Sequence, residues 1–470
     1  MDKRNERAAE RRMDARRPAQ RARNGRPPKH EAHLNAREVA RWALTDVVRA
    51  GSYVSAALDR HLNTTQLSAE DKRLAASLFF TAVENRLLLE ARLSLFWTER
   101  PEPVVEDILH IAAAQLLLMD KIPDHAAVDE AVKQTRASGR DGLAALVNGI
   151  LRSLIRARDA GELPEITDPA VLYSFAPNLA RRLMEAYGAQ EAEKIMADRP
   201  RPSQTIRFNA MKTSAEDFEK YLKAHDVIFE RGVVPGAYRC PAAGNLARLD
   251  GFRNGYFSIQ GESSMLAALA VEPKPGMNVL DACAAPGGKS SLIAEKMADV
   301  GRVYAWDVHE HRVELIRAAK QRLKLDCLRP AVRDARQPYA DFDLYMDAVL
   351  VDAPCSGLGV IADKPDIKYR LTDEQIESLL PLQRELLENC ARFVKVGGLL
   401  VYSTCTILPE ENEKQVRAFL ERHPEFALEP DAGYLPEPLR ERCVDGMAQF
   451  LSYRDGVEGF FIARMRRKGV

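Results

Sequence analysis

The sequence is poor in cysteine and has no long apolar segment. Its 470 residues include only seven cysteines, and no two of them have the Cys-x-x-Cys spacing. This scarcity excludes a disulfide framework and gives no support to a zinc ribbon or a thioredoxin-type redox site. We therefore predict reduced thiols, no bound metal and a cytoplasmic location. No stretch approaches the roughly 18 apolar residues that cross a bilayer, and the N-terminus lacks the apolar core of a secretory signal, so no membrane association is expected.

Two common nucleotide-binding motifs are also missing. The glycine-lysine step at 288–289 would belong to a P-loop only if position 283 were glycine, and it is cysteine. The Gly-x-Gly-x-x-Gly fingerprint of dinucleotide-binding proteins does not occur. Nucleotide hydrolysis and nicotinamide chemistry therefore lose support.

The charges are balanced overall but unevenly distributed. There are 68 basic and 68 acidic residues, yet positions 1–30 hold eleven Lys or Arg against four Asp or Glu. Residues 1–34 are low in apolar content, which predicts a disordered basic tail. Such a tail is either simply solvated or attracts nucleic-acid phosphates, and its charge alone does not decide between them.

Three folded regions follow this tail. From 35 to 160 the apolar residues recur at helical spacing, which predicts an all-α domain of five to seven helices. Residues 161–262 mix proline-punctuated helical segments with short strands and predict a small α+β connector. From 263 to 470 strands alternate with helices, which predicts an α/β domain with a parallel sheet covered on both faces. The expected strands are 278–283, 302–307, 327–334, 348–352, 399–403 and 459–464.

The carboxyl ends of these strands gather reactive side chains at one edge of the sheet. Open α/β sheets bind their ligands at this edge. The first strand runs into the turn Cys283-Ala284-Ala285-Pro286-Gly287-Gly288-Lys289, and the later ends supply Asp307, Asp334, Asp352 with Cys355, and Cys405. Asp307 lies 19 residues after Gly288, about where a Rossmann-type site binds ribose hydroxyls. We therefore expect an adenosine-containing cofactor.

Two cysteines at this edge suggest a chemical reaction. Cys355 and Cys405 lie in polar loops, where a thiolate with a lowered pKa can act as a nucleophile. Methylation of a pyrimidine at carbon 5 needs such a thiolate, because its addition to carbon 6 makes carbon 5 nucleophilic. A carboxylic acid near ring nitrogen 3 favours the addition, and the base must be exposed or flipped out. The other cysteines are expected to be unreactive, with Cys283 lining the cofactor site and Cys240, Cys327, Cys390 and Cys443 buried.

Four segments resemble motifs of the RNA (cytosine-5) methyltransferase family, also called the NOL/NOP/Sun or Sun/Fmu family. They are Gln-Gly-Glu-Ser-Ser at 260–264, Asp-Ala-Cys-Ala-Ala-Pro-Gly-Gly-Lys-Ser at 281–290, Asp-Ala-Pro-Cys-Ser-Gly at 352–357, and Tyr-Ser-Thr-Cys-Thr at 402–406 with Glu-Glu-Asn at 410–412. The N-terminal helical region resembles a NusB-like RNA-binding domain, ending in Val-Asn-Gly-Ile-Leu-Arg at 147–152. This pairing resembles the bacterial RsmB type. Gly261 replaces a more usual acid, so one loop contact is expected to be missing.

The resemblance implies a Rossmann-like class I methyltransferase domain at 263–470 that uses S-adenosylmethionine to methylate a cytosine of small-subunit ribosomal RNA. It implies that Cys405 is the nucleophile and that Cys355 assists breakdown of the covalent intermediate. Residues 283–289 would hold the cofactor, with Asp307 at its ribose and Asp334 at its adenine. Asp352 would lie between the methionine portion and the cytosine, and Lys289 would point into the site.

Two alternatives stay open. The same chemistry can act on transfer RNA, or the chain can be a non-catalytic RNA-binding or ribosome-assembly factor. The four-residue set Lys289, Asp352, Cys355 and Cys405 speaks against the second. The candidate RNA-binding positions are the tail, Arg199, Arg201, Arg207, Arg464, Arg466, Arg467 and Lys468. We expect a monomer.

Overall fold

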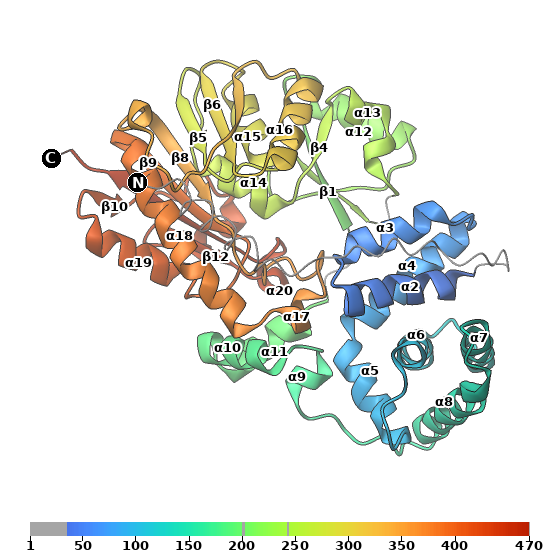
Figure 1. Ribbon diagram of the computed structural model, residues 1–470. Helices are drawn as coiled ribbons and strands as arrows, with labels where there is room; N and C mark the ends of the chain where they lie inside the picture. Colours follow the sequence, from blue (N-terminus) through green and yellow to red (C-terminus); the bar gives the residue numbers. More distant parts are fainter. Residues whose placement is uncertain (1–34, 200–202, 242–243, 470) are drawn as a thin grey trace, which may run out of the picture.

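The computed structural model describes residues 35–199, 203–241 and 244–469 (Figure 1). The predicted basic tail and Arg201 lie outside these residues. Within the described ranges, no helix combines the length and apolar character needed to cross a membrane.

The N-terminal region is all helical, as predicted. Its helices pack around one hydrophobic cluster, with α6 at the centre because nearly all its side chains are buried. The chain enters through a capping box, in which the Asn35 side chain accepts from backbone amides of the first turn and Glu38 returns a contact. The helices are α2 (Ala36–Ala50), α3 (Val54–Thr64), α4 (Ala69–Glu84), α5 (Arg86–Leu93), α6 (Pro103–Leu118), α7 (Asp124–Ala137) and α8 (Ala144–Asp159).

The connector consists of two structurally distinct parts. Three short helices come first: α9 (Pro169–Leu172), α10 (Pro177–Tyr187) and α11 (Ala189–Ala197). Figure 1 shows them between the N-terminal helices and the larger sheet. An antiparallel sheet in the order β2-β3-β1-β4 follows, comprising β1 (Ser203–Phe208), β2 (Glu230–Arg231), β3 (Ala237–Pro241) and β4 (Phe257–Ile259). Beside it lie α12 (Ala215–Ala224), whose first turn is capped by the side chain of Ser214, and α13 (Asp250–Arg253).

The C-terminal domain is a helix-covered sheet in the order β11-β12-β13-β9-β8-β5-β6-β7, with β10 beside β13. The strands are β5 (Asn278–Asp281), β6 (Arg302–Asp307), β7 (Leu328–Val332), β8 (Met346–Asp352), β9 (Val394–Thr404), β10 (Phe426–Leu428), β11 (Cys443–Val444), β12 (Met447–Phe450) and β13 (Phe460–Arg467). The helices are α14 (Glu262–Leu269), α15 (Gly288–Lys296), α16 (Glu310–Leu323), α17 (Ile367–Arg370), α18 (Asp373–Phe393), α19 (Glu413–Arg422) and α20 (Ser452–Asp455).

The prediction of a purely parallel sheet was wrong. Strands β5 to β9 are parallel to one another, but β13 pairs antiparallel with β9 and continues into antiparallel β12 and β11. The connection through 405–459 contains α19 and the short strands β10, β11 and β12 before α20, and β13 returns beside β9 from the opposite end, a direction that the residues of the strand itself do not encode. The reversal brings the start of β13 next to the end of β9, where Cys405 lies.

Candidate active site

The structure brings the two predicted cysteines into contact. Cys355 follows β8 and Cys405 follows β9, and these neighbouring parallel strands pair up to Asp352 and Ser403. The two Sγ atoms are 3.3 Å apart. Two thiols that are fifty residues apart in the sequence are therefore in direct contact.

A lysine and an aspartate lie directly beside this pair. The Nζ atom of Lys289 is 2.7 Å from Oδ2 of Asp352, and the hydroxyl of Ser403 donates to Oδ1 at 2.8 Å. The ring of Phe460, at the start of β13, lies 5.6 Å below the ammonium group of Lys289. Burial opposes the charge of Lys289, but the carboxylates of Asp352 and Asp281 outweigh it and raise the pKa of this lysine.

The surroundings make the two thiols unequal. A hydrogen bond from Cys355 lowers the pKa of Cys405, and the nearby ammonium groups of Lys289 and Lys364 act in the same direction against burial. The same hydrogen bond raises the pKa of Cys355, as do its burial and the nearby carboxylate of Glu411. Cys405 is therefore the thiol that ionises first, and Cys355 keeps its proton.

A buried carboxylate, to which the sequence assigned no role, holds the two cysteine loops together. Glu411 accepts from the backbone amide of Ser356 at 2.9 Å and from the amide of Gln383 at 2.9 Å. The Ser356 hydroxyl also contacts Oε1 of Glu411 and lies 2.7 Å from the hydroxyl of Thr406. The Glu-Glu-Asn motif at 410–412 was the only sequence signal for this contact.

The predicted cofactor turn forms the adjacent end of the site. Asp281 is buried at the end of β5, its Oδ2 accepts from Ser290 at 2.6 Å, and burial raises its pKa to about 6. Gly287 has φ 103°, and a Cβ there would lie 3.3 Å from Ile316, so a side chain is disfavoured. Cys283 stays protonated because burial raises its pKa well above the usual range.

These residues fit S-adenosylmethionine. Oδ1 of Asp281 is buried without a hydrogen-bond partner in the described structure. Asp307 ends β6 as predicted, and its carboxylate accepts from the amide of His309 at 3.1 Å while pairing with half-buried Arg312 at 3.0 Å. An acceptor at the second strand end and a glycine turn at the first match a nucleoside with an amino-acid tail.

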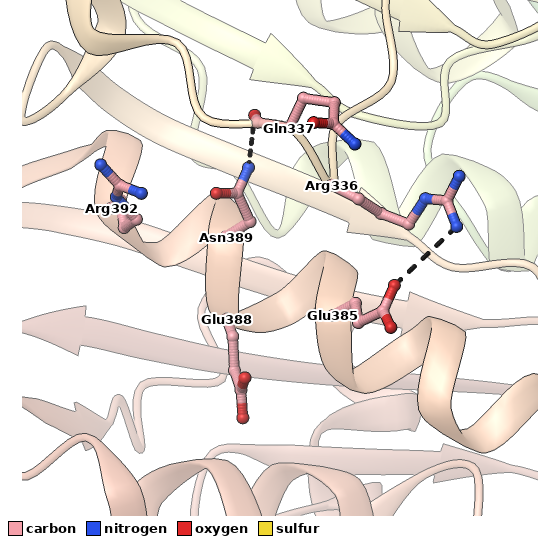
Figure 2. Close-up of a pocket in the computed structure, with 6 residues that line it drawn as sticks. All are labelled: Arg336, Gln337, Glu385, Glu388, Asn389 and Arg392. Carbon is pink, nitrogen blue, oxygen red and sulfur yellow. Dashed lines mark hydrogen bonds and ion pairs between the residues drawn. The ribbon is translucent and has the colours of Figure 1, made fainter. Parts of the chain in front are cut away.

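Asp334 lies near the predicted place but is already paired. It stands two residues beyond β7, and Arg336 donates to its two carboxylate oxygens at 2.7–3.1 Å. Figure 2 shows Arg336 reaching toward Glu385 on α18, and Asn389 donating to the carbonyl of Gln337. The side chains drawn in Figure 2 line a surface pocket, all of them are polar or charged, and none of them is a predicted site residue.

The loop contact expected to be missing at Gly261 is replaced by a residue from another segment, Glu458. A Cβ on this glycine would lie 2.3 Å from Oε1 of Glu458. Glu458 lies just before β13, and its Oε2 accepts from the amide of Ser263 in the first turn of α14 at 2.9 Å. A carboxylate from another part of the chain therefore caps the helix in place of the missing acid.

Several sequence expectations outside the centre were wrong. Arg207 and Arg464, proposed for RNA binding, are buried and paired with Glu295 and Glu272. They were misassigned because a buried arginine and a surface arginine look alike in sequence. Cys443 is only partly buried, whereas the other three cysteines expected in the core, Cys240, Cys327 and Cys390, are buried.

Comparison with known proteins agrees with this site. A family model described as 16S rRNA methyltransferase RsmB/F matches residues 268–466, and a NusB family model matches 34–156. A probable ribosomal RNA small subunit methyltransferase B of Bacillus subtilis is 38% identical over 447 residues, covering 93% of this chain and 99% of that protein. The corresponding Synechocystis protein is 34% identical, with 92% and 100% covered.

Solved structures give the same picture. The structure titled "Crystal Structure of PH0851" has a TM-score of 0.76 at 26% identity and covers 92% of this chain and 99% of that one. A methyltransferase homologue from Pyrococcus horikoshii has a TM-score of 0.55 at 29% identity, covering 64% and 98%. The fold and the site thus define an S-adenosylmethionine-dependent methyltransferase with a NusB-type N-terminal domain. The chain belongs to the RsmB/F family of 16S rRNA methyltransferases.

Proposed function

We propose that this protein methylates carbon 5 of a cytosine in 16S ribosomal RNA through a covalent cysteine–cytosine intermediate. The observation that carries the proposal is the contact between Cys355 and Cys405, 3.3 Å apart, beside the Lys289–Asp352 ion pair. A non-catalytic RNA-binding factor has no need of a thiol with a lowered pKa next to a second, protonated thiol.

The roles follow from these surroundings. The Cys405 thiolate adds to carbon 6 of the flipped base, and the electron pair of the 5,6 double bond moves to carbon 5. Asp352, which contacts Lys289 and Ser403, would lie at the hydrogen-bonding edge of the base near ring nitrogen 3 and favour the addition. S-adenosylmethionine supplies an electrophilic methyl group when bound. Once Cys405 is bonded to carbon 6, Cys355 no longer faces a neighbouring thiolate; after it has released its proton to solvent, its own thiolate accepts the carbon-5 proton. The electrons of that C–H bond re-form the 5,6 double bond, and Cys405 leaves as a thiolate.

The residues that would hold the cofactor lie at or just after the carboxyl ends of β5, β6 and β7. Residues 283–289 would surround the amino-acid portion, Asp307 would accept from the ribose hydroxyls and Asp334 would contact the adenine. Arg336 already donates to both carboxylate oxygens of Asp334. Asp334 would therefore contact the adenine through its backbone, or through its side chain after Arg336 moves away.

The test uses unmodified 16S ribosomal RNA, transfer RNA and labelled S-adenosylmethionine. We expect 5-methylcytosine in the ribosomal RNA with the wild-type protein and none with Cys405→Ala. Cys355→Ala should accumulate a protein–RNA adduct that survives denaturant. Cys443→Ala, a partly buried cysteine on β11, is the matched control and should behave like the wild type.

Two outcomes would overturn the proposal. Methylation by Cys405→Ala would remove the nucleophile assignment, and labelling of transfer RNA in preference to ribosomal RNA would change the substrate. Mapping the modified base by mass spectrometry separates carbon-5 methylation from methylation at any other atom.

A further inference from the structure

The loop that carries Cys355 is anchored to two other parts of the protein. After Cys355 the chain makes several tight turns and enters α17, a single helical turn. Lys368 in this turn is only 1% exposed. Its Nζ donates to the carbonyl of Glu84 at 2.8 Å, at the end of α4, and to the carbonyl of Tyr173 at 3.0 Å, next to α9.

Neighbouring residues repeat this connection. The backbone carbonyl of Lys368 accepts from the amide of Ala176 at 2.6 Å. Arg370 donates to the carbonyls of Gly51 and Ser52, after α2, at 3.0 and 3.2 Å. Tyr369 packs against the core of the N-terminal helices. One short turn thus contacts the ends of two N-terminal helices and the connector at once.

The same turn is continuous with the catalytic loops. The amide of Gly359 donates to the carbonyl of Cys405 at 3.0 Å, and Gly459 donates to the carbonyl of Gly359 at 2.9 Å. A hydrophobic cluster joins this loop to the Cys405 loop and to the connector helices; its members include Leu358, Ile376, Ile407, Leu408, Phe175, Leu179 and Leu183. Interior packing transmits displacements, because it contains few voids.

The chemistry of Lys368 suits an anchor better than a surface contact. The Lys368 amine donates to two carbonyls. A neutral amine carries two protons, so two acceptors satisfy it fully. The ring of Phe175 lies 5.2 Å from Nζ. Burial and the nearby Arg199 lower the pKa of Lys368 to about 7, against the opposing effect of Glu84. A buried lysine without a direct carboxylate partner is costly, and this cost indicates a role beyond packing.

We propose that Lys368 is a positioning residue for methyl transfer: it ties the loop that carries Cys355 to the N-terminal helical domain and the connector, so the seating of that domain sets the position of the Cys355 thiol. This inference rests on the proposed function, since it acts through the release step assigned to Cys355. It makes the N-terminal domain part of the catalytic geometry as well as a contributor to RNA binding.

The experiment compares full-length Lys368→Met and Arg370→Gln with the wild type. Methionine keeps the length and volume of the lysine but donates no hydrogen bond. The control is Lys274→Met, because Lys274 is exposed at the opposite end of β5 from the site. Four quantities are measured: kcat, KM for S-adenosylmethionine, the fraction of protein in a denaturant-resistant RNA adduct at steady state, and amide hydrogen exchange at 357–366.

We expect kcat to fall by about 10- to 100-fold in Lys368→Met, the range associated with small misplacements of catalytic groups. The adduct fraction should rise and exchange at Gly359 should speed up, while KM for S-adenosylmethionine stays unchanged. A general loss of folding would reduce the adduct together with the activity. Arg370→Gln should show the same changes in weaker form, and it carries the test if Lys368→Met does not fold, because its side chain is 35% exposed.

The inference is overturned if both variants keep the wild-type kcat and adduct fraction, or if kcat falls with no rise in adduct. The wild-type reaction separates this failure from failure of the proposed function. If the wild-type protein forms neither 5-methylcytosine nor an adduct, the proposed function itself is wrong; normal wild-type chemistry with unaffected variants removes only the role of Lys368.

Discussion

Gly359 and Gly459 lie so close together beside the active site that one added methyl group should strongly reduce activity. Gly359 on the Cys355 loop packs against Gly459, just before β13. A Cβ on Gly359 would lie 1.9 Å from the carbonyl oxygen of Gly459 and 3.0 Å from that of Cys405. All these atoms are backbone, so Gly359→Ala forces the loop to move away from Cys405.

The contacts of Gly359 allow us to estimate both the loss of stability and the loss of catalytic rate in Gly359→Ala. Overpacking costs about 1–3 kcal/mol, and distortion of the two hydrogen bonds at Gly359 adds about 1 kcal/mol each. A loss of roughly 3–5 kcal/mol leaves most molecules folded if the domain has a stability in the middle of the typical range of about 5–15 kcal/mol. A displacement of the Cys355 thiol by about 1 Å can lower the rate by about 100-fold. Activity should therefore fall far more than the folded fraction.

The assay measures kcat and thermal unfolding of Gly359→Ala on the same preparation. Gly142→Ala is the matched control, because a Cβ on this exposed glycine meets no atom within 4 Å and its φ is not in the left-handed region. A Gly359→Ala protein with wild-type kcat, or with a loss of activity no larger than its unfolded fraction, would refute the reasoning.

Three further predictions concern the surroundings of the site. Gly261→Asp should destabilise the protein by about 1–3 kcal/mol through its clash with Glu458, and the second substitution Glu458→Gly should relieve this loss in thermal melting. Burial and the charge of Arg86 lower the pKa of His110 from 6.5 to about 4. The stability that neutral His110 contributes is therefore complete above pH 6.5 and is lost as the pH falls toward 4. Urea unfolding across this range should show the free energy of unfolding falling with pH, and His110→Gln should reduce this dependence. Asp307→Ala should weaken S-adenosylmethionine binding by about 10- to 100-fold, the value of hydrogen bonds to a charged group. It should also lower the melting temperature slightly, because the His309 amide and Arg312 lose their partner; unaltered calorimetric affinity would remove Asp307 from the cofactor site.

Much of the fold could be predicted because local patterns and tertiary structure agree. The strand 302–307 was predicted with the bounds that β6 has, and the helix beginning after Ser214 follows from a cap that depends on neighbouring residues alone. The antiparallel β13 was not predicted in its true orientation, because strand direction depends on a long connection and leaves no mark on the strand's own residues. Helix α14 was missed for a related reason: its cap, Glu458, is supplied by a segment 195 residues away.

The same distinction, between local patterns and contacts distant in sequence, separates the site residues that could be predicted from those that could not. Lys289, Asp352, Cys355 and Cys405 could be found because each follows a strand, and parallel strands bring their carboxyl ends to one edge. Glu411, Glu458 and Lys368 could not be assigned roles, because each acts on a segment distant in sequence. Arg207 shows the opposite error, since its buried ion pair with Glu295 is invisible in a stretch that reads as basic surface.

The division of labour between the two thiols follows from their separation more than from either motif. Two thiolates 3.3 Å apart would repel each other by about 5 kcal/mol at an effective dielectric constant near 20, so only one can carry a charge at neutral pH. Lys289 and Lys364 favour that charge on Cys405, while Glu411 disfavours it on Cys355. The protonated thiol must therefore stay close enough to donate its hydrogen bond. Contacts that fix the Cys355 loop, such as the one proposed for Lys368, would therefore act on the release of the base, the step in which Cys355 takes part.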